Sequence, residues 1–492
     1  MAPPDDMHGH VDGSSAGPAA ETRIRLGHLP EELLLRIVEF VYGPDVELEQ
    51  AYLLADRHAV FHALALVDRR FRRLATPLLY RVFATSENPF RERQRARKTA
   101  LFLRALRDNP ALREHVRGLC LYTAEGRDKY PSTELFAQVR ELVTLVPETA
   151  FLHVNGGFDD FRTETLEIVG TAIVSMKRLR HLSLNRQGYG PTLEDVVREF
   201  RRSLDIRRLS LNGVTAMMRV TGPIIHEKVH HAPLPRFTSH NLPASSPLYS
   251  HGPQEYRTAS FTHLTLKDYS EDWAATAQLL SWPRALHSFE FGNFRNNRND
   301  MDLCMFGNAL LQHRDTLTAL DLGFLRRRSS ADAGEAATMI DVSLFPALRE
   351  LTLSRWSFRS TDLAFTGETG RRLLAPRLRR FTWSFGIGFM ESERLSDMGP
   401  NEEAWLRDFG NYAAERRRRG GEACDGGCLR TIYVRYLPIR VLGEQGSAEY
   451  PWDRLRRVAD DLAPRGIELL YSDPKWSRED WQECVKAWED WT

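Results

Sequence analysis

Five consecutive residues, His226-Glu227-Lys228-Val229-His230, have the spacing of a zinc-dependent hydrolytic site. On a helix, two histidines four positions apart share one face and can bind Zn²⁺, while the adjacent glutamate activates a water molecule. The surrounding sequence argues against this chemistry, because Pro223 and Pro233 leave room for only about two helical turns. A third ligand is also hard to find, since Glu255 lies in a Ser/Pro-rich stretch. We therefore interpret these histidines as incidental surface residues and expect no metal and no catalytic residue.

Other residues that could support chemistry are isolated. Cys424 and Cys428 are separated by one residue more than the common metal-binding pair, and no second pair matches them. The Gly-x-Gly sequences at 188–190 and 386–388 lack the third glycine and the strand-to-helix context of a dinucleotide loop. We therefore expect no cofactor.

Composition limits the remaining classes of function. The 492 residues can form two or more domains or one long repeat array, and 67 basic and 66 acidic residues leave no net field to attract nucleic acid or an anionic membrane. Five cysteines predict no disulfide framework. Residues 1–21 lack the apolar core of a signal peptide, and no run approaches the roughly 18 apolar residues of a membrane span. We expect a soluble cytoplasmic or nuclear protein with a disordered start over residues 1–23.

Two amphipathic segments between residues 24 and 83 carry apolar stripes too wide for an isolated helix pair to bury. The first begins at Leu29-Pro30-Glu31-Glu32, where proline suits the first helical position and the acidic residues suit the positive helix end. The second, predicted as one helix over residues 64–75, repeats apolar residues at helical spacing between arginines. A surface loop is predicted over residues 42–62. The exposed stripe is predicted to contain Leu33, Ile37, Val67 and Phe71.

The order of these residues resembles the F-box, the module that docks a substrate receptor onto the Skp-type adaptor of a cullin ubiquitin ligase. Two features differ from the family: the connection between the segments is long, and Asp68 stands where many members have cysteine. The resemblance implies adaptor-binding residues Leu29, Pro30, Leu33, Leu34, Ile37, Leu64, Val67, Phe71 and Leu74. The alternative is an ordinary helical hairpin that packs these residues against the rest of the protein.

One phrase recurs through the rest of the chain: an apolar residue, two polar residues, then apolar, polar, apolar. Strong copies begin at Leu179, Ile206, Phe261, Leu286, Leu317, Leu348, Leu378 and Leu429, and weaker copies lie at 116–121 and 151–154. Most steps are in the high twenties to about thirty residues, with two gaps near twice that, so two units are degenerate or carry insertions. Each copy predicts a short strand that directs two alternating apolar residues inward, with a covering segment that is often helical.

This pattern resembles the leucine-rich repeat, particularly the irregular repeats that often follow an F-box. We therefore predict an α/β fold in which the helical F-box of residues 24–83 precedes an irregular leucine-rich-repeat solenoid, residues 100–475, with a curved parallel sheet. A Pro/Ser-rich insertion is predicted near 221–258, and an amphipathic helix over 476–492 is predicted to cap the last repeat. The family's asparagine or cysteine after each strand is absent, which predicts hydrophobic plugging of the turns. The residues at these positions are Gln187, Val214, Tyr269, Phe294, Leu325, Trp356 and Gly386.

Period-two alternation also predicts which strand residues face away from the core. As the resemblance implies, these polar residues would form a recognition surface for a protein substrate. The residues assigned to it are Ser183, Asn185, Arg208, Ser210, Asn212, Thr265, Lys267, Glu290, Asp321, Thr352, Arg380 and Thr382. The alternative is that these positions are polar only because they face water.

Together, the two resemblances imply a non-catalytic substrate-recognition subunit of a Skp-cullin-F-box ubiquitin ligase. Its expected partners are a Skp-type adaptor, through it a cullin, and an unidentified protein substrate, with no nucleic acid and no membrane. Two alternatives stay open: a non-ligase F-box or leucine-rich-repeat interaction scaffold and, remotely, a zinc metallopeptidase that uses His226, Glu227 and His230.

Overall fold

The computed structural model forms two compact units, Met1–Leu79 and Tyr80–Thr492. The residues that it describes are 29–42, 54–85, 92–122, 133–156, 162–185, 205–214, 257–269, 273–292, 301, 303–323, 325, 339–358, 363–386, 397–420, 429–438, 449–474 and 477–489. The predicted insertion near 221–258 lies almost entirely outside these residues.

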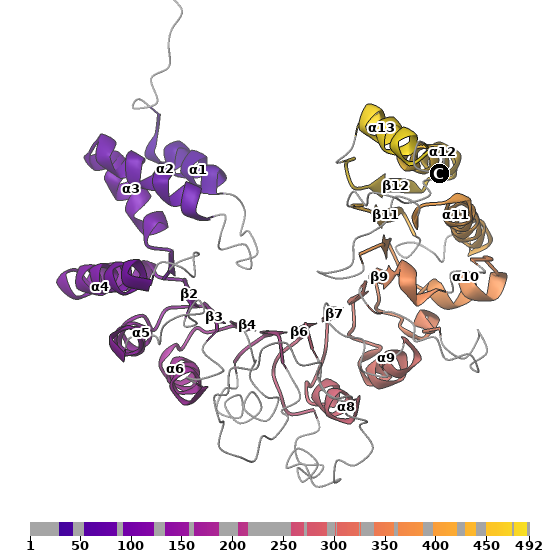
Figure 1. The fold of residues 1–492 in the computed structure, drawn as a ribbon. Helices are drawn as coiled ribbons and strands as arrows, with labels where there is room; N and C mark the ends of the chain where they lie inside the picture. The colour runs from indigo at the N-terminus through magenta and orange to yellow at the C-terminus, as the bar shows by residue number, and fades with distance from the viewer. Residues whose placement is uncertain are drawn as a thin grey trace, which may run out of the picture. The chain divides into compact units, whose positions relative to one another are not determined.

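The described part of unit 1 consists of three helices, α1 (Glu31–Tyr42), α2 (Leu54–Val67) and α3 (Arg69–Leu79), drawn in indigo in Figure 1. Asp68 separates α2 from α3, and its Oδ1 accepts a hydrogen bond from the Phe71 amide at 2.8 Å. This is an N-cap, which begins a new helix where we predicted one continuous helix over residues 64–75. The predicted surface loop over 42–62 is also corrected, because α2 already begins at Leu54.

Unit 1 has a small core of its own. Leu34, Phe71 and Leu74 form one buried cluster, with the half-buried Leu29 and Leu64 packed against it. A second cluster is formed by Phe61, Ala75 and Leu78. Polar contacts also tie the helices together, since Arg70 Nη2 donates to the Leu29 carbonyl at 2.5 Å and Arg73 pairs with Glu31.

Unit 2 contains a twelve-stranded open sheet in which each strand pairs in parallel with the next strand in the sequence. Its strands are β1 (Val82–Ala84), β2 (Gly118–Tyr122), β3 (Phe151–Asn155), β4 (His181–Asn185), β5 (Arg208–Asn212), β6 (His263–Lys267), β7 (Ser288–Gly292), β8 (Ala319–Leu322), β9 (Glu350–Ser354), β10 (Arg380–Ser384), β11 (Thr431–Arg435) and β12 (Glu468–Tyr471). The predicted α/β class and parallel pairing are confirmed. The sheet begins at β1, inside the segment 24–83 that we assigned to the helical module, because Phe83 packs into the core of unit 2.

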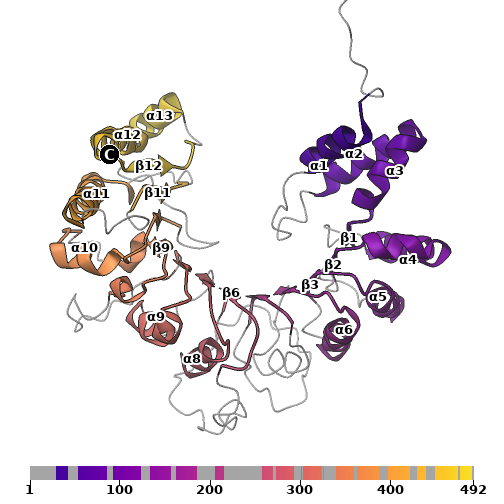
Figure 2. The same cartoon turned by 180° about the vertical axis from the view of Figure 1, so that it is seen from behind.

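The helices of unit 2 cover one face of this sheet (Figures 1 and 2). The α-helices are α4 (Glu92–Asp108), α5 (Thr133–Leu145), α6 (Arg162–Ser175), α8 (Trp273–Ser281), α9 (Leu303–Leu310), α10 (Gly367–Leu373), α11 (Pro400–Gly420), α12 (Pro451–Leu462) and α13 (Arg478–Glu489). Short 3₁₀ helices are η3 (Pro110–His115), η6 (Leu311–His313), η8 (Val342–Leu344), η9 (Arg355–Ser357) and η12 (Ala463–Arg465). The opposite face is covered by none of these elements, and we call it the helix-free face.

The two long gaps in the repeat pattern are insertions rather than degenerate units. β5 pairs directly with β6, and β10 pairs directly with β11, so no strand is missing between them. In the second gap the chain forms α11, a helix of 21 residues. The predicted hydrophobic plugging of the turns is confirmed at Val214, Tyr269 and Leu325, which are buried, whereas Trp356 and Gly386 are half-buried.

Backbone hydrogen bonds at the start of each strand hold neighbouring repeats in one register. The carbonyl of Arg180, for example, accepts bonds from the amides of Arg207 and Arg208, at 2.7 and 2.9 Å. The carbonyl of Arg207 accepts in the same way from Thr262 and His263. Equivalent strand positions are therefore aligned in rows across the sheet.

Candidate functional site

Exposed apolar side chains are concentrated on α1 and α2 of unit 1. We call this set the apolar surface, and it consists of Leu33, Leu35, Ile37, Phe40, Val60, Leu66 and Val67. Phe40 is 84% exposed, Leu66 65% and Val67 64%. In the described part of unit 2, the other large apolar residues that are exposed, Leu101, Val174, Leu344 and Leu470, belong to four separate elements. Among the described residues, the small helical unit thus has more exposed large apolar side chains than the much larger sheet unit.

The predicted adaptor-binding residues fall into three groups. Leu34, Phe71 and Leu74 are buried in the core of unit 1, and Leu29 and Leu64 are half-buried against them. The exposed members are Pro30, Leu33, Ile37 and Val67. In the predicted stripe only Phe71 is misplaced, because the Asp68 cap starts α3 so that Phe71 packs with Leu34.

Sequence reasoning missed Leu35, Val60 and Leu66 of the apolar surface. A helix turns about 100° per residue, so an apolar residue next to a predicted stripe can lie either beside the stripe or in the core. Phe40 can be recognised from the sequence, since it continues the helical spacing of Leu33 and Ile37.

The second candidate region is the helix-free face of unit 2. All twelve residues assigned to substrate binding alternate with the buried apolar strand residues, as predicted. Arg208 and Arg380 are exposed, whereas Ser183, Ser210 and Thr382 are buried. The remaining seven are half-buried: Asn185, Asn212, Thr265, Lys267, Glu290, Asp321 and Thr352.

Three adjacent strands place nine polar residues on this face in a regular grid. His181, Arg208 and His263 are direct register partners on β4, β5 and β6 and form the first row. The middle row is Ser183, Ser210 and Thr265, and the third row is Asn185, Asn212 and Lys267. We call these nine residues the donor patch, because each side chain can donate a hydrogen bond and none is a carboxylate.

Burial keeps the imidazoles of His153, His181 and His263 in the neutral form. Burial lowers the pKa of His153, on β3, to about 4. Burial, the Arg208 guanidinium and neighbouring imidazoles lower the pKa of His181 to about 4. His153 Nδ1 and Ser183 Oγ are hydrogen-bonded at 2.9 Å, which orients the hydroxyl at the floor of the grid.

Carboxylates occupy the next strands of the same face. Glu290 on β7 and Asp321 on β8 are direct register partners. Lys267 Nζ lies 3.0 Å from Glu290 Oε1, so this carboxylate is neutralised. Burial raises the pKa of Asp321 to about 6, although its Oδ1 accepts a bond from the Gly323 amide at 2.8 Å. The face therefore changes from donor-rich at β4–β6 to acidic at β7–β8.

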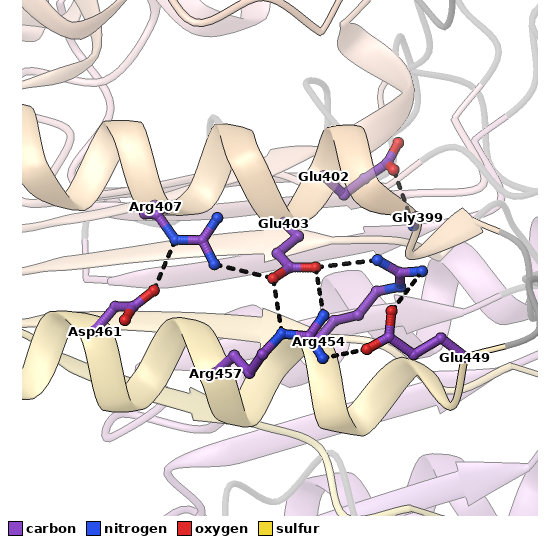
Figure 3. A network of polar contacts seen from close by, with 8 residues as sticks. All are labelled: Gly399, Glu402, Glu403, Arg407, Glu449, Arg454, Arg457 and Asp461. Atoms are coloured by element: carbon purple, nitrogen blue, oxygen red, sulfur yellow. Dashed lines mark hydrogen bonds and ion pairs between the residues drawn. The ribbon is translucent and has the colours of Figure 1, made fainter.

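A network of arginine and glutamate side chains joins α11 to α12 (Figure 3). Glu403 accepts hydrogen bonds from Arg407, Arg454 and Arg457 at 2.8 to 3.1 Å. Burial alone would raise the pKa of Glu403, but these hydrogen bonds lower it. Glu449 also pairs with Arg454, and Asp461 pairs with Arg407, so three carboxylates balance three guanidinium groups. We therefore assign the network a structural role.

Within the described residues, no group of three or more His, Cys, Asp or Glu side chains could hold a metal ion. The predictions made for His226, Glu227, His230, Cys424 and Cys428 concern residues outside the described ones. Among the described helices, none combines the length and apolar character needed to cross a bilayer.

A comparison with protein-family models finds no match, and a comparison with curated protein sequences finds none either. The support for the two candidate regions therefore comes from the residues of this chain.

Proposed function

We propose that this chain is the substrate-recognition subunit of a Skp-cullin-F-box ubiquitin ligase. In this proposal the apolar surface of unit 1 docks a Skp-type adaptor, which connects the chain to a cullin. Unit 2 is an irregular leucine-rich-repeat array whose helix-free face holds a protein substrate. The chain itself contributes binding surfaces and no catalytic residue.

The observation that carries the proposal is the apolar surface. Exposed apolar side chains that are concentrated on one small unit, unlike those scattered singly over a surface, indicate a site of interaction. Burial contributes roughly 25 cal/mol for each Å² of apolar area removed from water, so leaving these side chains in water costs free energy that a docked partner recovers. Leu33, Ile37 and Val67 belong to this surface, and they are also residues at which the F-box resemblance implies adaptor contact.

The test is affinity purification of the tagged full chain from cells, followed by measurement of the copurified Skp-type adaptor and cullin. Ile37→Ser combined with Val67→Ser should abolish adaptor recovery. The matched control combines Leu101→Ser with Val174→Ser, which removes two similarly exposed apolar side chains from unit 2 and should leave recovery unchanged. Replacing Leu29 is less informative, because Leu29 packs against the core of unit 1.

Three outcomes separate the candidate functions. Loss of adaptor and cullin in the unit 1 variant alone supports a ligase receptor. Adaptor recovered without cullin from the unchanged chain supports the non-ligase scaffold instead. Equal adaptor recovery from both variants would show that the apolar surface is not the docking site.

A further inference from the structure

The residues directly before β1 to β11 form a row along the amino-terminal ends of the strands. From β2 onward, the amide of each residue donates to the carbonyl of the equivalent residue one strand earlier, which holds the row in register. The amides of Arg379 and Arg430, for example, donate to the carbonyls of Arg349 and Arg379 at 2.8 and 2.9 Å. Seven of the eleven residues are arginine and none is acidic. Positive charge therefore recurs along this row.

The positive charge is densest around the loops that lead into β9 to β12. The described residues of these four loops contain five arginines and no carboxylate, and they are 345–349, 374–379, 429–430 and 463–467. The last turn of α11 adds four arginines, residues 416–419. Arg416 Nη1 donates to the Leu374 carbonyl at 2.7 Å, in the loop before β10. Arg417 Nη1 donates to the Gly466 carbonyl at 3.2 Å, in the loop before β12. We call these nine arginines the basic ridge.

Most of this charge is not compensated by carboxylates. Arg349, Arg377 and Arg430 are exposed and form no ion pair with a described residue. Within the α11 turn, Arg419 is paired with Glu415. The bonds from this turn to backbone carbonyls orient guanidinium groups but do not neutralise them, because a carbonyl carries no formal charge.

The carboxyl-terminal ends of the same strands differ in charge. After β9, Arg355 is buried, and its Nη2 lies 2.6 Å from Glu402 Oε1. The residues that follow β10 and β11 are Phe385 and Tyr436, and both are buried. Accessible positive charge in this part of unit 2 is therefore concentrated where the strands begin.

We infer that the basic ridge binds the phosphate backbone of a nucleic-acid duplex. Neighbouring strands lie about 4.8 Å apart, so Arg349, Arg379 and Arg430 place positive charges in a line at roughly that spacing. A duplex also carries its charge in a line, with one phosphate for each ~3.4 Å of a strand. All nine cations of the ridge are arginine, and the guanidinium fork binds phosphate through two parallel hydrogen bonds. The inference goes beyond the proposed function and does not depend on it.

The residues around the ridge favour a duplex over other polyanions. Proteins that hold single strands stack bases on aromatic side chains, and Phe345, the aromatic residue in the described part of the four loops, is buried. Binding to a bilayer surface uses several exposed apolar residues beside the charge, whereas Leu344 is the one large exposed apolar residue described next to these loops. We expected no nucleic-acid partner because charge balances over the whole chain, but contact with phosphates depends on local charge.

The test measures fluorescence anisotropy of labelled duplexes with the full-length chain at several salt concentrations. Duplex DNA and duplex RNA of one sequence are compared with the corresponding single strands, polyglutamate and phosphatidylserine vesicles. At least one duplex should bind more tightly than every other ligand, and a difference between DNA and RNA identifies the source of the backbone. The logarithm of the binding constant should fall with the logarithm of salt concentration by about 0.9 for each neutralised phosphate.

Arg377→Gln combined with Arg430→Gln removes two charges from the ridge. This variant should weaken duplex binding about tenfold and reduce the salt slope by about 2, because two phosphate contacts are lost. The matched control combines Arg97→Gln with Arg104→Gln, which removes the same charge from two exposed arginines of α4 and should change binding by less than about twofold. Lysine at both ridge positions keeps the charge and should preserve the salt slope with a smaller loss of affinity. Equal melting temperatures would confirm that the variants fold.

Equal losses in the ridge variant and the α4 variant would overturn the inference, because binding would then follow net charge. Failure of both duplexes to bind would also overturn it. Tighter binding of single strands, polyglutamate or vesicles than of either duplex would assign the ridge to another ligand and overturn it as well. Adaptor recovery is measured separately on the same variants, so duplex binding without adaptor contradicts the proposed function alone, and adaptor binding without duplex contradicts this inference alone.

Discussion

The two units differ in the burial of apolar residues that recur at regular spacing. In unit 2 the inward strand residues, such as Leu182, Leu264 and Leu351, are at most 1% exposed and belong to one continuous core. In unit 1 the cores are small, and residues of the same type, such as Leu33 and Leu66, lie on the surface. The difference teaches that an apolar residue at regular spacing can be buried in the core of one unit and exposed on the surface of the other.

The largest expected effect on stability is in the continuous core. Leu351→Ala in β9 should reduce the free energy of unfolding by about 2 to 5 kcal/mol, because it leaves a cavity between packed layers. Urea unfolding monitored by circular dichroism measures this change. A decrease in the free energy of unfolding below about 1 kcal/mol would mean that the core of unit 2 is not close-packed at β9. The contrast with the small cores of unit 1 would then not hold.

The next effect concerns the ionic network of α11 and α12. Glu403→Gln should cost about 2 to 3 kcal/mol, because it leaves the buried Arg454 with only part of its compensating charge. The control is Glu368→Gln, which removes an exposed partner of Arg371 and Arg372 and should change the free energy of unfolding much less than Glu403→Gln. Equal costs in the same unfolding measurement would show that burial does not strengthen the network.

Acidification should destabilise unit 2 through its neutral imidazoles. The pKa of His153 and of His181 is about 4 in the folded chain and about 6.5 when unfolded, so the unfolded chain binds more protons between these values. Stability is therefore highest above pH 6.5 and falls as the pH decreases toward 4.

Hydrogen exchange at β3–β5, measured across this pH range, can detect the loss. His181→Asn removes one ionisable group and should flatten the pH dependence. An unchanged pH profile in that variant would contradict the assignment. His153 and Arg208 should be left unchanged in the experiment, because they are the nearest charged or titratable groups on the flanking strands.

The smallest effect is expected on the apolar surface. Val67→Ser should change the free energy of unfolding by less than about 0.5 kcal/mol, because the side chain is 64% exposed. Val174→Ser on α6, 69% exposed, should behave in the same way. A loss above about 2 kcal/mol for Val67→Ser alone would favour the alternative in which this surface packs within the chain.

Most of the sheet could be predicted because each strand repeats a complete phrase with two inward apolar residues. β1 and β12 were missed because each has an incomplete phrase. The last apolar position of the β1 copy is Thr85, whose Oγ1 accepts a bond from the Tyr122 amide at 2.9 Å. The first apolar position of the β12 copy is Gly466, whose φ of +70° favours a residue without a side chain.

The division of unit 1 into core and surface could not be predicted from spacing. Phe71 and Val67 are one turn apart and both continue the apolar pattern, yet the helix boundary at Asp68 buries the first and leaves the second exposed. The grid on β4–β6 was predictable position by position, because strict register follows from equal strand phrases. The neutral state of the imidazoles could not be predicted, since the pKa of each imidazole depends on its burial by neighbouring strands.

Direct pairing of β5 with β6 has a practical consequence for engineering. Fifty residues separate Asn212 from His263 in the sequence, yet the two strands meet with the same register as β4 and β5. The entropic cost of bringing two chain segments together grows only logarithmically with the length of chain between them, so doubling this length costs about 0.6 kcal/mol. The connection between β5 and β6 is therefore a suitable place to insert a fluorescent reporter domain. Both strands would keep their hydrogen-bonded neighbours in the sheet.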